Sequence, residues 1–252
     1  MAAEDLVVVH GGAVTADFYT RLAKALKGRV AVHLYDRRGR GSAGPKPAGY
    51  TVDDEIADLA AVLERTGARN VFGHSYGGLV VMRAALEIEF DHIVLYDGTV
   101  NVDDVFPSDY VPRMRRYIDA GDLPRAIAVM SGGLQLTKLP FGARILLARA
   151  FLRTPIGRTM GELLPTSILE TEEVVAQSGP AQEYAGVTAR TLLSCGARSG
   201  AYYREMNERL AAVMPDARTH VLPRASHNAA CVARPHFANM VADFLTKEPV
   251  RS

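Results

Sequence analysis

The segment from residue 70 to residue 79 reads NVFGHSYGGL and decides the fold of this chain. A short apolar run ends at Phe72, and a strongly apolar helical pattern begins at Leu79. Between them stands a G-x-S-x-G motif, in the strand–turn–helix context that this motif requires. Gly73 and Gly77 stand two positions to either side of Ser75, where neighbours without bulk are needed because a residue on so tight a turn takes a strained backbone conformation. We therefore expect the turn to project the Ser75 hydroxyl above the carboxyl edge of a sheet.

Short apolar runs alternate with helical patterns on both sides of this segment. The other predicted strands are Leu6–Val9, Val30–Tyr35, His92–Tyr96, Thr191–Ser194 and Arg218–Leu222. The predicted helices of this part are Thr51 to Gly67, Leu79–Ile88, Tyr202–Val213 and Phe237–Leu245. Strands that are nearly all apolar suit a parallel sheet covered on both faces. The pattern predicts an α/β fold, with a mostly parallel sheet of about six strands and helices on both faces.

The alternation stops after residue 100 and returns near residue 186. No convincing strand lies between Asn101 and about Ala185, where the helical patterns are Tyr110–Ala120, Leu123–Met130, Arg144–Arg153 and Glu170–Gln177. We therefore predict a core of residues 1–100 and 186–252, and a helical lid, 101–185, inserted after the strand ending at Tyr96. Such insertions usually lie over a functional site. Its apolar residues are expected mostly in helix packing, with some lining a pocket: Leu134, Leu136, Leu139, Phe141, Ile145, Leu146 and Phe151.

Three further motifs, in the right order, extend the pattern over most of the chain. They are His10-Gly11-Gly12 after the first strand, DRRGRGS at 36–42, and LPRASH at 222–227. With these motifs the chain resembles the α/β-hydrolase superfamily. The resemblance implies an oxyanion hole formed by the amides of Gly12 and Tyr76, with Ala13 close behind Gly12. It also implies that Ser75 is a nucleophile and that the lid covers it.

Seven histidines compete for the role of the base. His227 follows the last predicted core strand on a loop, in the chain order Ser…His that suits this fold. An imidazole with a pKa of about 6.5 can accept the Ser75 proton and return it. His74 is expected to pack beneath the sheet edge, and His10 to brace the oxyanion loop. The remaining four are interpreted as surface or strand-edge residues: His33, His92, His220 and His236.

The resemblance also implies a catalytic acid after the strand that follows the lid, and no acid stands there. After the strand that follows the lid, residues 196–200 read GARSG, and no carboxylate appears before Glu205. Asp97, at the end of the strand after the nucleophile helix, is the substitute because strand ends on one edge of a parallel sheet converge. Alternatively, Asp97 is a turn residue before Gly98 and the site is a Ser–His dyad. Asp103 and Asp104 are lesser candidates for the acid.

Composition excludes several classes of function. The charge balance of 29 basic and 28 acidic residues has no basic excess for nucleic acid, and no apolar run is long enough to span a membrane. We find no nucleotide-binding or metal-binding motif, and expect neither cofactor nor metal. The N-terminus shows no signal peptide, so a cytoplasmic protein is expected. Cys195 and Cys231 are interpreted as buried thiols, and Arg37 and Arg38 as a solvated or ion-paired loop.

The predicted function is that of a serine hydrolase acting on an ester, lactone or thioester. Its substrate is expected to be small, partly apolar and neutral or weakly charged, in a pocket with few tyrosines. The protein is expected to be a monomer or a homodimer. The missing acid leaves open a cyclase, lyase or carbon–carbon bond-forming enzyme of bacterial secondary metabolism. A ligand-binding or receptor role is the third possibility, because a fold does not decide the function.

Overall fold

Six strands form one parallel sheet in the computed structural model, which describes residues 4–247. The strands are β1 (Glu4–Val9), β2 (Val30–Leu34), β3 (Asn70–His74), β4 (His92–Tyr96), β5 (Arg190–Gly196) and β6 (Ala217–Leu222). Their order across the sheet is β2-β1-β3-β4-β5-β6, and every neighbouring pair is parallel. The predicted fold class is confirmed. Each predicted strand is present, with ends that differ by a few residues.

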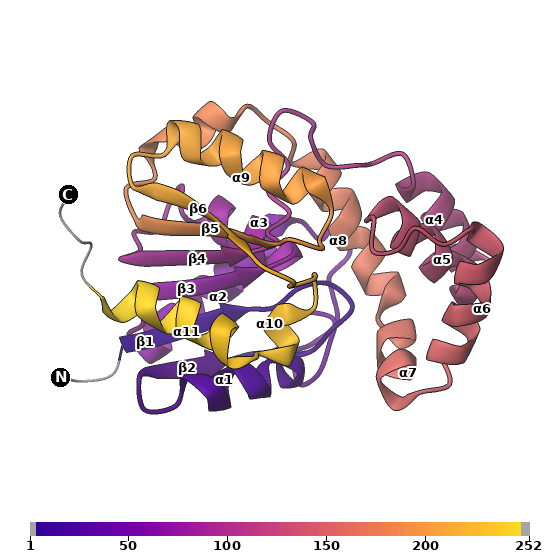
Figure 1. Cartoon of the computed structure of the whole chain (residues 1–252). Helices are drawn as coiled ribbons and strands as arrows, with labels where there is room; N and C mark the ends of the chain where they lie inside the picture. The colour runs from indigo at the N-terminus through magenta and orange to yellow at the C-terminus, as the bar shows by residue number, and fades with distance from the viewer. Residues whose placement is uncertain (1–3, 248–252) are drawn as a thin grey trace.

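Helices cover both faces of this sheet (Figure 1). One face carries α1 (Thr20–Leu26), α10 (Ala229–Val232) and α11 (Pro235–Thr246), and the other carries α2 (Val52–Thr66), α3 (Tyr76–Ala84) and α9 (Ala201–Val213). Side chains alternate between the two faces along each strand, so Leu6 and Val8 join one apolar cluster and Val7 and Val9 the other. Burial on both faces explains why the strands are apolar throughout.

The segment between β4 and β5 is helical, as predicted. It contains α4 (Val111–Asp119), α5 (Leu123–Gly133), α6 (Phe141–Phe151), α7 (Pro155–Glu162), α8 (Leu164–Ala176) and the 3₁₀ turn η2 (Ala181–Gly186). Another 3₁₀ turn, η1 (Ala16–Tyr19), precedes α1. Helices α4–α7 lie beside the sheet, at the right of Figure 1, and α8 leads back to the core. Within residues 4–247, the pairing in this segment is one isolated bridge between Val102 and Gly179.

Individual residues set the ends and the packing of these helices. Pro155 begins α7, because proline suits the first position of a helix. Thr154 caps that helix by accepting a hydrogen bond from the Gly157 amide at 3.0 Å. Of the apolar residues expected in helix packing or in a pocket, Leu136, Leu139 and Leu146 are 44%, 44% and 65% exposed, so helix packing does not bury them.

The strand order determines where the site lies. The chain passes from β1 to β2 on one side and returns to β3 on the other side of β1. A crevice forms where such connections diverge, beyond the carboxyl ends of the strands. The loop after β1 begins at His10, and the turn after β3 contains Ser75. These two segments therefore meet at the crevice.

Candidate active site

The turn at Ser75 has the strained geometry that the motif predicts. Ser75 has φ +54° and ψ −124°, and α3 begins at the next residue rather than at Leu79. Its carbonyl accepts hydrogen bonds from the amides of Gly78 at 2.8 Å and Thr99 at 3.0 Å. A Cβ on Gly77 would overlap the Val9 carbonyl, so glycine is required there. The turn at Ser75 therefore contacts both the end of β1 and the segment that follows β4.

Asp97 contacts His227 at the carboxyl edge of the sheet. Asp97 is completely buried, and its Oδ2 lies 3.0 Å from His227 Nδ1. A carboxylate only accepts hydrogen bonds, so His227 carries its hydrogen on Nδ1. In the neutral ring Nε2 is then unprotonated and able to accept a proton.

Two donors from the end of β5 hold the Asp97 carboxylate. The Gly196 amide donates to Oδ1 at 3.0 Å, and the Ser199 hydroxyl donates to Oδ2 at 2.5 Å. These residues lie in the GARSG stretch, where the resemblance places an acid. The chain thus has the carboxylate on β4 and its donors on the neighbouring strand β5. Ser199 was not predicted; the signal was a hydroxyl in a stretch that lacked the expected carboxylate.

Ser199→Ala is expected to lower kcat about tenfold with a small change in KM. The substitution removes one charge-assisted hydrogen bond from Asp97 and leaves His227 with its carboxylate partner, and tenfold corresponds to about 1.4 kcal/mol. Ser178→Ala is the matched control, because Ser178 donates to the exposed Asp104 at 2.6 Å. Steady-state kinetics of the two variants give the comparison, and equal rates would show that the Ser199 bond has no part in turnover.

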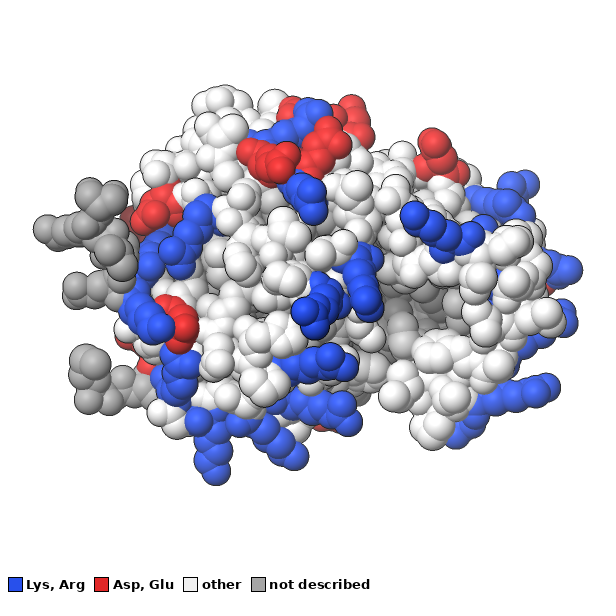
Figure 2. All heavy atoms as spheres, viewed as in Figure 1, with Lys and Arg blue, Asp and Glu red and all other residues white. Residues whose placement is uncertain are grey.

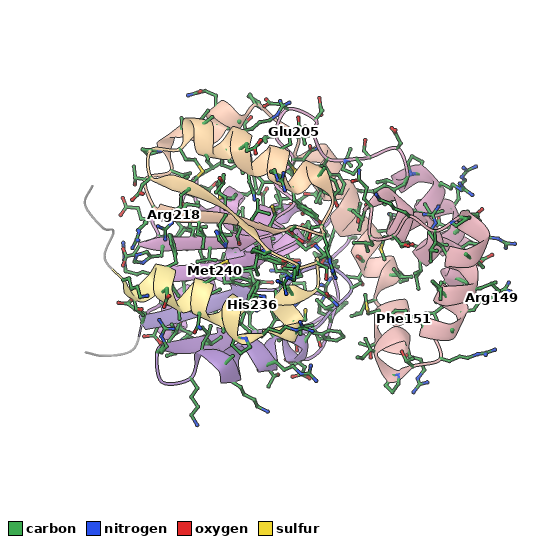
Figure 3. The ribbon with its side chains drawn as sticks, in the orientation of Figure 1. Arg149, Phe151, Glu205, Arg218, His236 and Met240 are labelled. Atoms are coloured by element: carbon green, nitrogen blue, oxygen red, sulfur yellow. The ribbon has the colours of Figure 1, made fainter. Side chains whose placement is uncertain are left out.

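The other candidate acids lie on the surface and contact other groups. Asp103 pairs with Arg209 at 3.0 Å, and Asp104 accepts from Ser178. Glu205 lies on the outer side of α9, where it also pairs with Arg209 (Figure 3). The turn interpretation of Asp97 also holds, since its φ is +45°, a conformation that aspartate tolerates better than most residues. Asp97 is thus both a turn residue and the partner of His227.

Aromatic side chains surround His227. The ring of Tyr203 stacks on it at a centroid distance of 5.5 Å and an interplanar angle of 16°, and the ring of His74 lies 4.7 Å away. Tyr96 donates from its hydroxyl to the Ser226 carbonyl at 2.8 Å, which fixes the loop before His227. The expectation of few tyrosines concerned the substrate pocket, and it stays a prediction.

The loop after β1 packs against both Ser75 and helix α8. A Cβ on Gly11 would lie 3.0 Å from the Ser75 Cβ. A Cβ on Gly12 would lie 2.8 Å from Ser167 Oγ and 3.1 Å from Glu170 Oε2, both on α8. A side chain at either position would therefore crowd these neighbours. Tyr76 is the first residue of α3, where helix amides lack partners within the helix.

A buried cluster of charged side chains donates hydrogen bonds to the backbone of this loop. We call it the charge cluster; its members are Arg37, Arg40, Lys46, Glu55 and Glu170, with side chains at most 5% exposed. Arg37 donates to the carbonyls of His10 at 2.9 Å and Gly11 at 3.0 Å. Arg40 also donates to Gly11, and it pairs with Glu170. The cluster therefore connects the β1 loop to α2 and α8.

The expectation of a solvated or ion-paired loop at Arg37 and Arg38 is confirmed, because both arginines form ion pairs. Arg37 is ion-paired but not solvated, whereas its neighbour Arg38 pairs with Asp54 and Asp58 at the surface with 31% of its side chain exposed. Burial lowers the pKa of Arg37, but the charges of Glu170 and Glu55 more than offset this effect, so the pKa of Arg37 is raised overall.

The two cysteines differ in burial. Cys195 is buried as expected and Cys231 is half-buried, and burial raises the pKa of both thiols to about 11.

His10 has the bracing contacts that the sequence suggested. Its Nδ1 lies 3.0 Å from the Gly11 carbonyl, and its Nε2 accepts from the Arg37 amide at 3.1 Å. Burial, followed by the charges of Arg37 and Arg40, lowers the pKa of His10 well below its usual 6.5. His10 is thus neutral, with its hydrogen on Nδ1, because the Gly11 carbonyl can only accept.

A hollow lies between the core and helices α4–α7, with lysine and arginine side chains on both sides of it (Figure 2). A cavity of about 690 Å³ adjoins the His227 loop, and Arg198, Arg224 and Arg234 are among its lining residues. Among residues 4–247, no three His, Cys, Asp or Glu side chains are grouped so that they could hold a metal ion. None of the helices described in that range has the length and apolarity to cross a membrane.

Comparisons with known proteins agree with this architecture. A family model described as "Alpha/beta hydrolase family" matches residues 6–241. An alpha/beta hydrolase from Sphaerobacter thermophilus is 27% identical, with 97% of this chain and 93% of that chain covered and a TM-score of 0.79. An enol-lactonase from Burkholderia xenovorans is 20% identical, with 98% and 93% covered and a TM-score of 0.71. An esterase from Exiguobacterium antarcticum is 16% identical, with the same coverage and TM-score. The last two likenesses show the fold alone.

Proposed function

This chain belongs to the alpha/beta hydrolase family, and from that premise we propose that it is a serine hydrolase. Its reaction is the hydrolysis of an ester, lactone or thioester of a small, partly apolar molecule. In this proposal Ser75 is the nucleophile, His227 the base, and Asp97 the acid that orients His227. The amides of Gly12 and Tyr76 form the oxyanion hole.

The contact between Asp97 and His227 is the observation that carries the proposal. The carboxylate is completely buried, lies 3.0 Å from His227 Nδ1, and is held by two donors from β5. A surface ion pair would need none of these features. A histidine held with its hydrogen on Nδ1 presents an unprotonated Nε2, which is the state that a general base requires.

The chemistry follows from this arrangement. His227 Nε2 takes the proton of the Ser75 hydroxyl as Oγ attacks the carbonyl carbon, and the carbonyl electron pair moves onto oxygen. The amides of Gly12 and Tyr76 stabilise that oxyanion. The oxyanion collapses to an acyl-serine, and His227 gives its proton to the leaving alcohol or thiol. Water then attacks the acyl carbon while His227 Nε2 takes its proton, and a second oxyanion forms. When that oxyanion collapses, the bond to Ser75 Oγ breaks, His227 returns the proton to Oγ, and the carboxylic acid leaves.

Residues 101–185 form the lid of this site in our proposal. Helix α8 contacts the β1 loop through Ser167 and Glu170, so the segment is attached to the core beside Ser75. Helices α4–α7 lie farther out, on the other side of the hollow in Figure 2. We propose that the acyl group of the substrate lies between the core and these helices. Partly buried apolar side chains there, such as Leu134 and Phe141, would contact it.

The alternative of a cyclase, lyase or carbon–carbon bond-forming enzyme depended on the missing acid. The carboxylate of Asp97 lies where that acid would act, because it contacts His227 Nδ1. The absence of an acid after β5 therefore no longer favours a non-hydrolytic reaction. For that reason hydrolysis is the function we propose.

A serine-directed probe tests the proposal. We expect a fluorophosphonate to label the protein at a single residue, Ser75, and we expect turnover of at least one p-nitrophenyl ester of a chain-length series. Ser75→Ala abolishes both signals, and mass spectrometry of the labelled peptide identifies the site. Ser178→Ala, a substitution at a half-buried serine that donates to the exposed Asp104, retains both. A folded wild-type protein that is neither labelled nor active on any ester would overturn the proposal.

A further inference from the structure

Three hydrogen bonds connect the β1 loop to the His227 loop through the interior. The Gly11 amide donates to the hydroxyl oxygen of Tyr19 at 3.2 Å. That hydroxyl lies 2.5 Å from His74 Nδ1, and His74 Nε2 lies 2.8 Å from the carbonyl oxygen of His227. We call this chain of contacts the relay. Tyr19 and His74 are both buried, at 0% and 4% exposed.

The donor and the acceptor of every hydrogen bond in the relay follow from the His227 carbonyl. The His227 carbonyl can only accept, so the hydrogen of His74 is on Nε2. In a neutral imidazole Nδ1 then accepts, and the Tyr19 hydroxyl must donate to it. The remaining lone pair of that hydroxyl accepts the Gly11 amide hydrogen. Burial, and next the charge of His227, lowers the pKa of His74 well below 6.5, which agrees with a neutral ring.

Each end of the relay adjoins a group with a role in the proposed reaction. Gly11 precedes Gly12, the proposed oxyanion donor, and His74 precedes the nucleophile Ser75. The carbonyl at the other end belongs to His227 itself. The three segments come from the ends of β1, β3 and β6, which are not all neighbours in the sheet. β1 and β3 are paired directly, whereas β4 and β5 lie between β3 and β6. The relay therefore connects the loop after β6 to two segments that the sheet does not place beside it.

We infer that Tyr19 and His74 are positioning residues, which hold the oxyanion loop and the His227 loop at fixed places relative to Ser75. The inference rests on the proposed function, because it assigns the relay to the geometry of that reaction. The outer hydrogen bonds of both side chains go to backbone groups, the Gly11 amide and the His227 carbonyl. The ring of His74 also lies 4.7 Å from the ring of His227. Displacements of about 1 Å at reacting groups can cost about 100-fold in rate, so such support has a measurable value.

Tyr19→Phe tests the relay, with Tyr35→Phe as the matched control. Both substitutions remove one buried phenol oxygen and keep the ring. The Tyr35 hydroxyl is buried and has no hydrogen-bond partner among residues 4–247, so its loss breaks no bond. We expect Tyr19→Phe to lower kcat about 10- to 100-fold with KM changed less than about threefold, and Tyr35→Phe to match the wild type. Equal kcat for the two variants would overturn the inference.

His74→Gln divides the relay into its two halves. The glutamine amide lies near the position of Nε2 and can still donate to the His227 carbonyl, but it offers Tyr19 no ring nitrogen. We expect a smaller loss of kcat than for Tyr19→Phe. We also expect the double variant to lose less than the product of the two single losses, because both residues belong to one network. Multiplying losses would show that Tyr19 and His74 act independently.

Nuclear magnetic resonance of ¹⁵N-histidine-labelled protein decides the relay without any turnover. We expect His74 to be protonated at Nε2 and bare at Nδ1, and the Nδ1–H signal of His227 to move in Tyr19→Phe but not in Tyr35→Phe. A His74 protonated at Nδ1, or an unmoved His227 signal, would overturn the relay. If the wild type hydrolyses nothing while these signals behave as expected, the proposed function fails and the relay as a positioning device for His227 stands.

Discussion

Asp97→Asn is expected to lower kcat by about 10⁴-fold and to leave KM nearly unchanged. The amide keeps the size of the carboxylate, and its oxygen can still accept from the Gly196 amide. Its nitrogen, however, cannot accept the hydrogen on His227 Nδ1. His227 then takes the other tautomer, with its hydrogen on Nε2, and can no longer remove the proton of Ser75.

The backbone at position 97 does not complicate this test. Asp97 has φ +45°, in the left-handed region, and asparagine is one of the residues that tolerate this region best. The matched control is Asp104→Asn, because Asp104 also has a positive φ, +57°, and also accepts from a serine. Steady-state kinetics on an active ester, with thermal melting of both variants, give the measurement. Near-normal turnover in Asp97→Asn would indicate a Ser–His dyad or another carboxylate.

Arg37→Met is expected to have the largest effect on stability, lowering the free energy of unfolding by about 3–5 kcal/mol. The Arg37 guanidinium is 0% exposed, with Glu55 Oε1 at 2.7 Å and Glu170 Oε1 at 2.9 Å. Removing it leaves two buried carboxylates with fewer cations. It also leaves the carbonyls of His10 and Gly11 without the Arg37 donor.

Arg38→Met is the matched control, with an expected loss of at most about 1 kcal/mol. Arg38 also pairs with two carboxylates, but in a partly exposed setting where water screens the pair. Urea unfolding followed by circular dichroism measures both variants, and the melting temperature of Arg37→Met should fall by roughly 10 °C. Equal losses for Arg37→Met and Arg38→Met would contradict the structural importance of the charge cluster.

The charge cluster also predicts how stability depends on pH. Burial raises the pKa of Glu55, but Arg37 and Lys46 lower it by more, so the net pKa lies below its usual 4.5. A group with a depressed pKa in the folded state stabilises the protein fully above its unfolded pKa and less as the pH falls through the folded pKa. Part of the wild-type stability is therefore lost below about pH 4.5. In Arg37→Met that loss should be smaller.

The fold and the strained turn at Ser75 were predicted from local patterns in the sequence. The apolar runs predicted the strands because burial on both faces of a parallel sheet leaves little room for polar residues. The turn at Ser75 was predictable because its strained backbone requires residues without bulk close by, here Gly73 and Gly77. Asp97 and His227 were predictable as a pair only through the rule that parallel strands end on one edge.

The net charge of the chain did not predict where basic side chains gather in the folded protein. The net charge of +1 suggested a neutral or weakly charged substrate, and that expectation stays a prediction. Yet the structure places Arg198, Arg224 and Arg234 around one cavity beside the His227 loop. They come from three separate loops, and Figure 2 shows basic side chains beside the hollow. A sum over the chain contains no information on such grouping, whereas the local field acts on the substrate.

The α/β fold, the helical insertion, the strained turn at Ser75 and the candidates Asp97 and His227 can all be predicted from the amino-acid sequence. Each depends on periodicity, on turn chemistry or on the order of motifs along the chain. Three contacts are seen only in the folded protein: Ser199 donates to Asp97, Arg37 joins Glu55 to Glu170, and Tyr19 contacts His74. The partners in those contacts are far apart along the chain. Only the folded sheet brings them within hydrogen-bond distance, and no local pattern specifies a partner so remote.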